Sequence, residues 1–465
     1  MSSSSGGFPM FSETGFFRDN APKNYTDLVR PRGLGMIMSQ TEPVQLPKGA
    51  ELASFLRNRE IGKKLKLNVP IYENKLWDWP IDNLVAHAVE RYLHLYGVDA
   101  QIDLKRRDEV ILPLVLGTIF QTLDLTLVVP ITLTHIEVSR FRLSNNAFIA
   151  KIPRKLQLGR ARINPIGSGA VKTVVGAATH AFVSKGWQLS VDDVNDVPRS
   201  LGEASPNVLD AIDSFFGALR VATGISTGYA QILWVPRRWT LQYFCDLAPV
   251  YGTTIRRYPN EFDNFGWNNQ RDTITVEQLK ETRRVYQAVV ASQSEGVRLA
   301  LNRLNACLTR SDAADAILDG TIGLELLLGD DDNQSLSYKL RLRAAALALL
   351  RANPAYPASE VVSKVKRLYT ARSKIVHGRR KKRSNKASEP MDASNSEERA
   401  LASNLLRFVL DALLTHPEYL DPLKIDDGLL LRADNVAVPT ADVKPRRRKR
   451  KADVTPDPSS NETSP

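Results

Sequence analysis

The stretch Leu368-Tyr-Thr-Ala-Arg-Ser-Lys-Ile-Val-His-Gly-Arg-Arg-Lys-Lys-Arg383 joins the end of an apolar-patterned segment to a dense run of cations. Apolar residues recur at helical spacing from Val361 to Ile375, which predicts an amphipathic helix over residues 358–377 that ends before Gly378. Arg372 falls on the same apolar stripe, where a charged side chain is costly to bury without a partner. We therefore expect Arg372 to meet an acidic side chain, a second subunit or a cleft.

The helical pattern continues on both sides of this stretch. Ser311 or Asp312 is expected to cap a helix that stops at Gly329. Ser394-Asn-Ser-Glu397 matches a capping box, so the last helix is expected to begin there and to end at Pro417. The remaining helical segments are expected at residues 276–308, 336–352 and 358–377. Together these segments predict an all-α helical bundle over residues 276–420.

The region before the bundle, residues 21–275, has a mixed α/β pattern. Helical spacing occurs at residues 83–96 and 207–223, and strand alternation occurs within residues 123–153. The sequence does not identify a known fold for this region. Residues 1–20 are rich in serine and glycine and are expected to be a flexible N-terminus. The expected fold class is α+β, because the strands precede a separate run of helices.

The positive charge of the chain is concentrated in two short segments. The net charge is +12, from 63 lysines and arginines against 51 aspartates and glutamates. Residues 379–386 contain six of the cations and residues 444–451 contain seven; without these 13, 50 cations remain against 51 acids. The body of the protein is therefore nearly neutral. Residues 433–465 are expected to be a disordered basic tail, which serves as a tethering arm or merely as a solvated segment.

The composition excludes several classes of protein. Two cysteines, Cys245 and Cys307, are too few for a disulfide framework. The N-terminus lacks the basic and apolar regions of a signal peptide, and the apolar stretch of residues 111–133 is interrupted by polar residues and proline. A cytoplasmic protein with no membrane partner is the expectation. Glycine loops typical of nucleotide binding are not complete in this sequence.

Arg372 and His377 are the candidate functional pair. An arginine can hold a phosphate through two hydrogen bonds, and a histidine can transfer protons near neutral pH. Each residue also has a purely structural interpretation. Arg372 can pair with Glu325, which also lies in an apolar run, and His377 can simply complement the helix dipole. On a regular helix the two residues point about 140° apart. They can share one site only if the last turn is distorted or a second copy of the chain supplies one of them.

The sequence resembles the ApeA-like HEPN domain family in about residues 280–416. The segment Arg372-Ser-Lys-Ile-Val-His-Gly378 is the specific part of this resemblance. Helical segments in matching order accompany it: Val297-Arg-Leu-Ala-Leu-Asn-Arg-Leu-Asn305, Gly323-Leu-Glu-Leu-Leu327, and Ser337-Tyr-Lys-Leu-Arg-Leu-Arg343.

The resemblance implies a HEPN helical bundle that dimerises, with the R-x4-6-H motifs of two subunits in one cleft. Many members are metal-independent endoribonucleases of antiphage defence or stress systems, and others are non-catalytic modules that bind nucleic acid or a partner protein. Arg372 and His377 match the catalytic positions, and Ser373 stands where many catalytic members have asparagine or aspartate. Glu325 is expected to support the arginine. No cofactor and no metal are expected at this site.

RNA is the expected substrate, and a homodimer the expected assembly. The cations that follow or interrupt the motif are expected to hold phosphates of the RNA backbone without reading base sequence. They are Lys374, Arg379, Arg380, Lys381, Lys382, Arg383 and Lys386. The region of residues 21–275 is expected to bind a trigger ligand or a regulatory partner.

A second constellation lies in the N-terminal region. His87, Glu90 and His94 have spacings of three and four, so they share one face of the predicted helix. Such residues can be part of a metal site, although the sequence offers no further ligand nearby and they can equally be ordinary polar residues. Cys245 lies in an apolar context and is expected to be an inert thiol.

Overall fold

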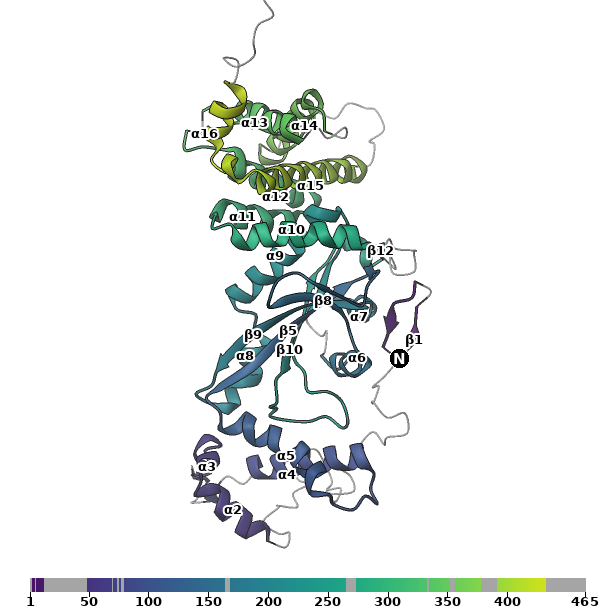
Figure 1. Ribbon diagram of the computed structural model, residues 1–465, viewed down its shortest axis with the longest axis vertical. Helices are drawn as coiled ribbons and strands as arrows, with labels where there is room; N and C mark the ends of the chain where they lie inside the picture. Colours follow the sequence, from purple (N-terminus) through teal and green to yellow (C-terminus); the bar gives the residue numbers. More distant parts are fainter. Residues whose placement is uncertain are drawn as a thin grey trace, which may run out of the picture.

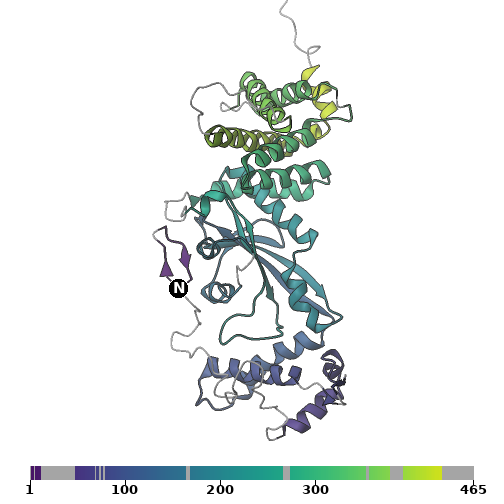
Figure 2. The same cartoon turned by 180° about the vertical axis from the view of Figure 1, so that it is seen from behind.

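The computed structural model describes residues 2–4, 6–11, 48–68, 70–72, 75–76, 79–163, 168–264, 273–332, 334–351, 356–377 and 391–431. The molecule is elongated, with a small helical layer at one end, a β-sheet layer in the middle and a helical bundle at the other end (Figure 1). The view from behind shows the same three layers (Figure 2). The predicted α+β fold class is confirmed.

The small helical layer precedes the sheet. Its helices are α2 (Gly49–Arg57), α3 (Glu60–Lys64), α4 (Trp79–Tyr96) and α5 (Leu104–Ile119), with the short strands β3 (Pro70–Tyr72) and β4 (Lys75–Leu76) between α3 and α4. The helix predicted at residues 83–96 is therefore α4, which begins one turn earlier. Asp103 caps α5 by accepting a hydrogen bond from the backbone N–H of Arg106 at 2.9 Å.

The middle layer is a six-stranded sheet in which every neighbouring pair is antiparallel. The strand order is β11-β10-β5-β9-β8-β7. The bounds are β5 (Thr122–Thr132), β7 (Arg140–Arg142), β8 (Ala147–Lys151), β9 (His180–Ser190), β10 (Gly228–Pro236) and β11 (Tyr251–Arg257). Two further pairs are β1 (Ser2–Ser3) with β2 (Pro9–Met10) and, in parallel, β6 (His135–Ile136) with β12 (Thr273–Ile274).

Short helices accompany the sheet, and one longer helix connects it to the bundle. The short ones are α6 (Arg154–Arg160), α7 (Lys172–Gly176) and α8 (Val197–Gly202), and the connecting helix is α9 (Pro206–Thr223). The spacing of apolar residues predicted α9 correctly. The predicted strands at residues 123–153 correspond to β5 to β8, with β5 ending at Thr132 and β6 beginning at His135. The apolar stretch of residues 111–133 forms the end of α5 and then β5.

The bundle follows β12 directly. Its helices are α10 (Val276–Ala291), α11 (Glu295–Thr309), α12 (Ala313–Leu328), α13 (Leu336–Arg351), α14 (Ala358–Val376), α15 (Met391–Thr415) and α16 (Pro422–Ile425). The short turns η5 (Pro417–Tyr419) and η6 (Asp426–Leu430) complete it.

Two helix boundaries differ from the sequence prediction. The expected single helix at residues 276–308 is broken, because Ser292 is extended and the side chain of Ser294 caps a new helix by accepting from the N–H of Val297 at 3.3 Å. The last helix begins at Met391, so the capping-box sequence at residues 394–397 lies inside α15 instead of opening it. In contrast, Asp312 caps α12, which is one of the two expected caps.

One hydrophobic core joins the sheet to the bundle through α9. Phe182 of β9 stacks on Phe215 of α9, with ring centroids 4.4 Å apart. On the other side, α9 approaches α11 so closely that a Cβ added at Gly217 would lie 2.7 Å from Cδ2 of Leu301. Buried Arg220 donates a hydrogen bond to Asn305 of α11. The core therefore continues across the predicted boundary at residues 275/276.

A buried ion cluster ties the bundle helices to the segment after α15. Arg343 of α13 is only 2% exposed. Its Nη2 donates to Oδ2 of Asp330 at 2.7 Å, its Nε donates to Oδ1 of Asp426 at 2.9 Å, and its Nη1 donates to the carbonyl of Leu328 at 2.8 Å. Two carboxylates and a carbonyl thus satisfy a buried guanidinium, which makes removal of either acid destabilising.

Candidate site at the end of α14

Helix α14 packs its apolar stripe into the bundle and leaves a polar face outside. Val361, Val365 and Leu368 are buried, as the spacing predicted. Arg372 follows on the same stripe, and Ile375 is half-buried against the core. Arg372 therefore extends from the end of the packed stripe toward the neighbouring helix α12.

Arg372 is paired with Glu325 of α12. The Nε of Arg372 lies 3.2 Å from Oε1 of Glu325, and the two side chains are 29% and 18% exposed. The two charges are in contact without a well-directed hydrogen bond between these atoms. Tyr369 completes the cluster, with its ring centroid 5.3 Å from Cζ of Arg372. Burial, together with the negative charge of Glu325, raises the pKa of Tyr369 above its ordinary value.

His377 lies at the opposite side of the end of α14. The residue is exposed and forms the C-cap of α14, with a φ of −91° and a ψ of 4° that lie outside the helical region. Its backbone N–H still donates to the carbonyl of Ser373 at 3.1 Å, as in a regular helical turn. The last turn is therefore not distorted, and the angular separation of about 140° between Arg372 and His377 holds. Within one chain, the fold does not aim these two side chains at one point.

A basic stripe leads along the exposed face of α14 to His377. Lys366, Thr370, Lys374 and His377 are all exposed, and their spacing of four, four and three residues puts them on one helix face. We call these four residues the α14 stripe. Ser373, beside the stripe, is half-buried. Arg379, Arg380, Lys381, Lys382, Arg383 and Lys386, the expected phosphate-binding cations, lie outside the described residues.

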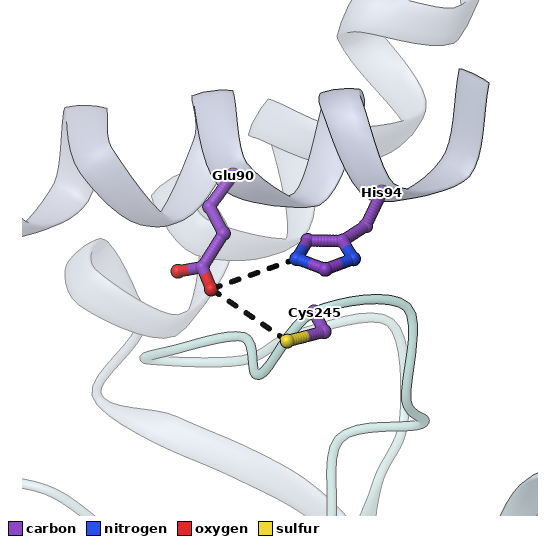
Figure 3. Close-up of side chains that lie close together, drawn as sticks. All are labelled: Glu90, His94 and Cys245. Carbon is purple, nitrogen blue, oxygen red and sulfur yellow. Dashed lines mark hydrogen bonds and ion pairs between the residues drawn. The ribbon is translucent and has the colours of Figure 1, made fainter. Parts of the chain in front are cut away.

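A second group of chemically active side chains lies where the loop of residues 237–250 meets α4. Glu90 and His94 hang from consecutive turns of α4, and Cys245 comes from the loop (Figure 3). Oε1 of Glu90 lies 3.9 Å from Nε2 of His94 and 3.7 Å from Sγ of Cys245. Burial, and secondly the nearby charge of Glu90, raises the pKa of the Cys245 thiol to about 12.

This group corrects part of the metal-site hypothesis. The sequence suggested His87 beside Glu90 and His94, whereas the structure brings Cys245 to the latter two and leaves His87 outside the group. Cys245, which lies in an apolar stretch of the sequence, contacts the carboxylate of Glu90 in the fold. Helical spacing could reveal Glu90 and His94, but no local signal links them to a cysteine 155 residues from Glu90.

A groove of about 500 Å³, lined by both polar and apolar side chains, lies at the junction of α9 with the break between α10 and α11. Asp210 and Ser214 of α9 line one side, and Ser292 and Glu295 line the other. Arg298 crosses between them, with its guanidinium 3.4 Å from both Asp210 and Glu295. The charges of the groove are thus largely balanced by one another.

Comparisons with known proteins yield no relative: no family description matches the chain, no curated protein matches it, and no solved structure matches it. The resemblance to HEPN domains rests on the segments quoted above. Among the described residues, none of the helices combines the length and the apolar character that crossing a membrane requires.

Proposed function

We propose that this chain is a cytoplasmic, metal-independent endoribonuclease of the HEPN type that acts as a homodimer in antiphage defence or stress. The observation that carries the proposal is the α14 stripe, in which exposed cations lead to an exposed histidine. The basic run of residues 379–386 follows this histidine almost directly in the sequence. Cations in line beside a proton-transfer group suit a substrate that is a polyanion.

The reaction that suits these residues is attack by the 2′-OH of RNA on its own phosphodiester. A base removes the 2′-OH proton as the 2′-oxygen bonds to phosphorus, and an acid protonates the 5′-oxygen as its bond to phosphorus breaks. Two copies of His377 would act as the base and the acid. Arg372 would stabilise the charge on the non-bridging oxygens.

The geometry of α14 favours a site shared by two subunits. Because the last turn is regular, one helix does not direct Arg372 and His377 to the same phosphate. The pair with Glu325 would hold the guanidinium of Arg372 in position until a phosphate competes for it.

The test is cleavage of a single-stranded RNA by purified full-length protein in EDTA, beside a DNA of the same sequence. The proposal predicts that only the RNA is cut, and that its products carry a 2′,3′-cyclic phosphate and a 5′-hydroxyl. If RNA stays intact with every trigger that is tried, or if the DNA is cut equally well, the proposal fails.

Subunit mixing tests the shared site. When wild-type chains exchange with a fourfold excess of H377A chains, the activity per wild-type chain should fall about fivefold. The reason is that only about one wild-type chain in five then pairs with another wild-type chain. If the activity per wild-type chain stayed the same whether or not H377A chains were added, a site made from two subunits would be contradicted.

The ion pair of Arg372 favours an alternative, in which the bundle is a non-catalytic HEPN module that binds nucleic acid or a partner protein. In that case Arg372 serves the packing of α14 on α12. The alternative predicts salt-sensitive RNA binding that survives H377A. The same binding should weaken in the double variant K366E/K374E and when the cations of residues 379–386 are neutralised.

A further inference from the structure

The side chains of Glu90, His94 and Cys245 form a group of metal-ligand type far along the chain from the α14 stripe. In the described part of the chain, this is the one group of three or more His, Cys, Asp or Glu residues whose ligand atoms lie within 4.8 Å of one another. The group combines a nitrogen, an oxygen and a sulfur ligand. This is the mixed donor set that zinc accepts, whereas calcium and magnesium prefer oxygen alone.

Two of the three distances between the ligand atoms are close to those of a tetrahedral zinc ion. From typical zinc–ligand distances, the sulfur and oxygen ligands of such an ion lie about 3.6 Å apart, and its nitrogen and oxygen ligands about 3.4 Å apart. The corresponding distances here are 3.7 Å for Cys245 Sγ to Glu90 Oε1 and 3.9 Å for His94 Nε2 to Glu90 Oε1. All three ligand atoms lie within 4.8 Å of one another, so binding would require the side chains to draw closer around the ion.

The burial of the three side chains also suits a metal site. His94 and Cys245 are fully buried, whereas the Glu90 side chain is 15% exposed. The fourth position of the ion would therefore be filled by the second oxygen of Glu90 or by a water that enters beside it. Figure 3 shows the Glu90 carboxylate beside both the imidazole and the thiol, with the helix above the group and the loop below it.

The loop that carries Cys245 is held in an unusual conformation. Cys245 has a φ of +51°, which is uncommon for a residue with a side chain and is typical of functional or tightly constrained sites. Arg91, on the same helix as Glu90, donates from Nη1 to the carbonyls of Cys245 and Leu247, both at 2.8 Å. These bonds fix the backbone at Cys245 and directly after it.

We propose that Glu90, His94 and Cys245 bind a zinc ion that fastens the loop of residues 237–250 to α4. The loop connects β10 to β11, so the ion links the small helical layer to the edge of the sheet. The same junction is packed by Tyr243 of the loop, whose hydroxyl donates to the carbonyl of Val110 in α5 at 3.0 Å. The inference is independent of the proposed nuclease activity, because none of its residues belongs to the bundle.

The first experiment measures metal bound to the full-length protein after purification without chelators. One zinc ion per chain is expected by elemental analysis. Replacement by Co²⁺ should give the thiolate-to-cobalt charge-transfer absorption of a cysteine-bound ion. A wild-type protein that retains no zinc and shows no such absorption with Co²⁺ would overturn the proposal and leave a hydrogen-bonded polar cluster as the explanation.

Two matched pairs of variants locate the ligands. C245S and H94Q should abolish the cobalt charge-transfer band or weaken binding more than tenfold. C307S alters the other buried thiol, and H87Q alters a histidine on the same helix outside the group; both should bind as the wild type does. A band that persists in C245S, or that is lost in C307S, would contradict the assignment.

X-ray absorption of the zinc-loaded wild type removes any dependence on the folding of variants. One sulfur neighbour at about 2.3 Å, together with nitrogen or oxygen neighbours, is the expected first coordination shell. A shell without sulfur would show that the metal is bound elsewhere and would overturn the proposal.

Discussion

The end of α14 and the Glu90–His94–Cys245 group differ in how their residues come together. Arg372 and His377 are neighbours in sequence, yet the regular helix turns them to different sides. Glu90 and Cys245 are separated by 155 residues, yet their side chains are in contact. Nearness in sequence is therefore a poor measure of a shared site, since a helix separates close residues and a folded loop joins distant ones.

The largest expected effect concerns the exposed end of α14. His377→Ala should lower the rate of RNA cleavage at least 100-fold, because general acid–base catalysis typically contributes at least this factor. The matched control is His416→Ala, which removes a histidine of the same bundle that lies 3.4 Å from Glu418. Initial rates at equal protein concentration provide the measurement. Equal losses in the two variants would mean that H377A acts through stability instead of chemistry.

The next largest expected effect concerns the stability that a metal ion at the Glu90–His94–Cys245 group would provide. If zinc binds at Glu90, His94 and Cys245, its removal should lower the free energy of unfolding by about 2.7 kcal/mol at a metal concentration of 100 times Kd. Thermal unfolding with and without chelator checks this for the wild type, C245S and C307S. The chelator should destabilise the wild type and C307S but not C245S. A chelator effect of equal size in all three would place the metal elsewhere.

The third prediction concerns Asp330, which forms ion pairs with Lys339 and Arg343 within the bundle. Hydrogen bonding from Lys339, and then from Arg343, lowers the pKa of Asp330 below its ordinary value. A carboxyl group with a lowered folded-state pKa stabilises the protein above its unfolded pKa of about 3.9 and loses that contribution as the pH falls through the folded value. Asp330→Asn should therefore destabilise the protein by about 1–3 kcal/mol at pH 7.

Urea denaturation at several pH values checks the effect of Asp330→Asn. The difference between wild type and variant should shrink as the pH falls below about 4, where the wild-type carboxyl group takes up its proton. Asp332→Asn is the control, because this exposed acid contacts Lys339 without touching Arg343. A difference that stays constant with pH would show that the charge of Asp330 is not its cause.

The smallest expected effect separates the two interpretations of Arg372. A double-mutant cycle of Arg372→Met and Glu325→Gln should give a coupling energy of about 0.5–1 kcal/mol in urea denaturation, because both side chains remain partly solvated. If the arginine also binds RNA phosphate, R372M should weaken cleavage far more than it lowers stability. Cleavage that falls only in proportion to the folded fraction would favour the structural interpretation.

Local patterns predicted much of the fold. The apolar spacing of α9 and of α14 identified both helices and their buried faces, and alternation within residues 123–153 identified β8. The break before α11 was missed because apolar spacing is nearly continuous across it, so the cap at Ser294 was not evident. The start of α15 was misplaced because a capping-box sequence can also lie within a helix.

The sequence alone determined that the second half of the chain is helical, that Arg372 lies on a buried stripe, and that cations surround His377. Only the tertiary structure decided that Arg372 meets Glu325, that α14 stays regular to its end, and that Cys245 reaches Glu90 and His94. The physical reason is that periodicity arises from the geometry of a single helix or strand. Contacts between distant segments depend instead on how the loops close and how the helices pack, which the spacing of residues does not record.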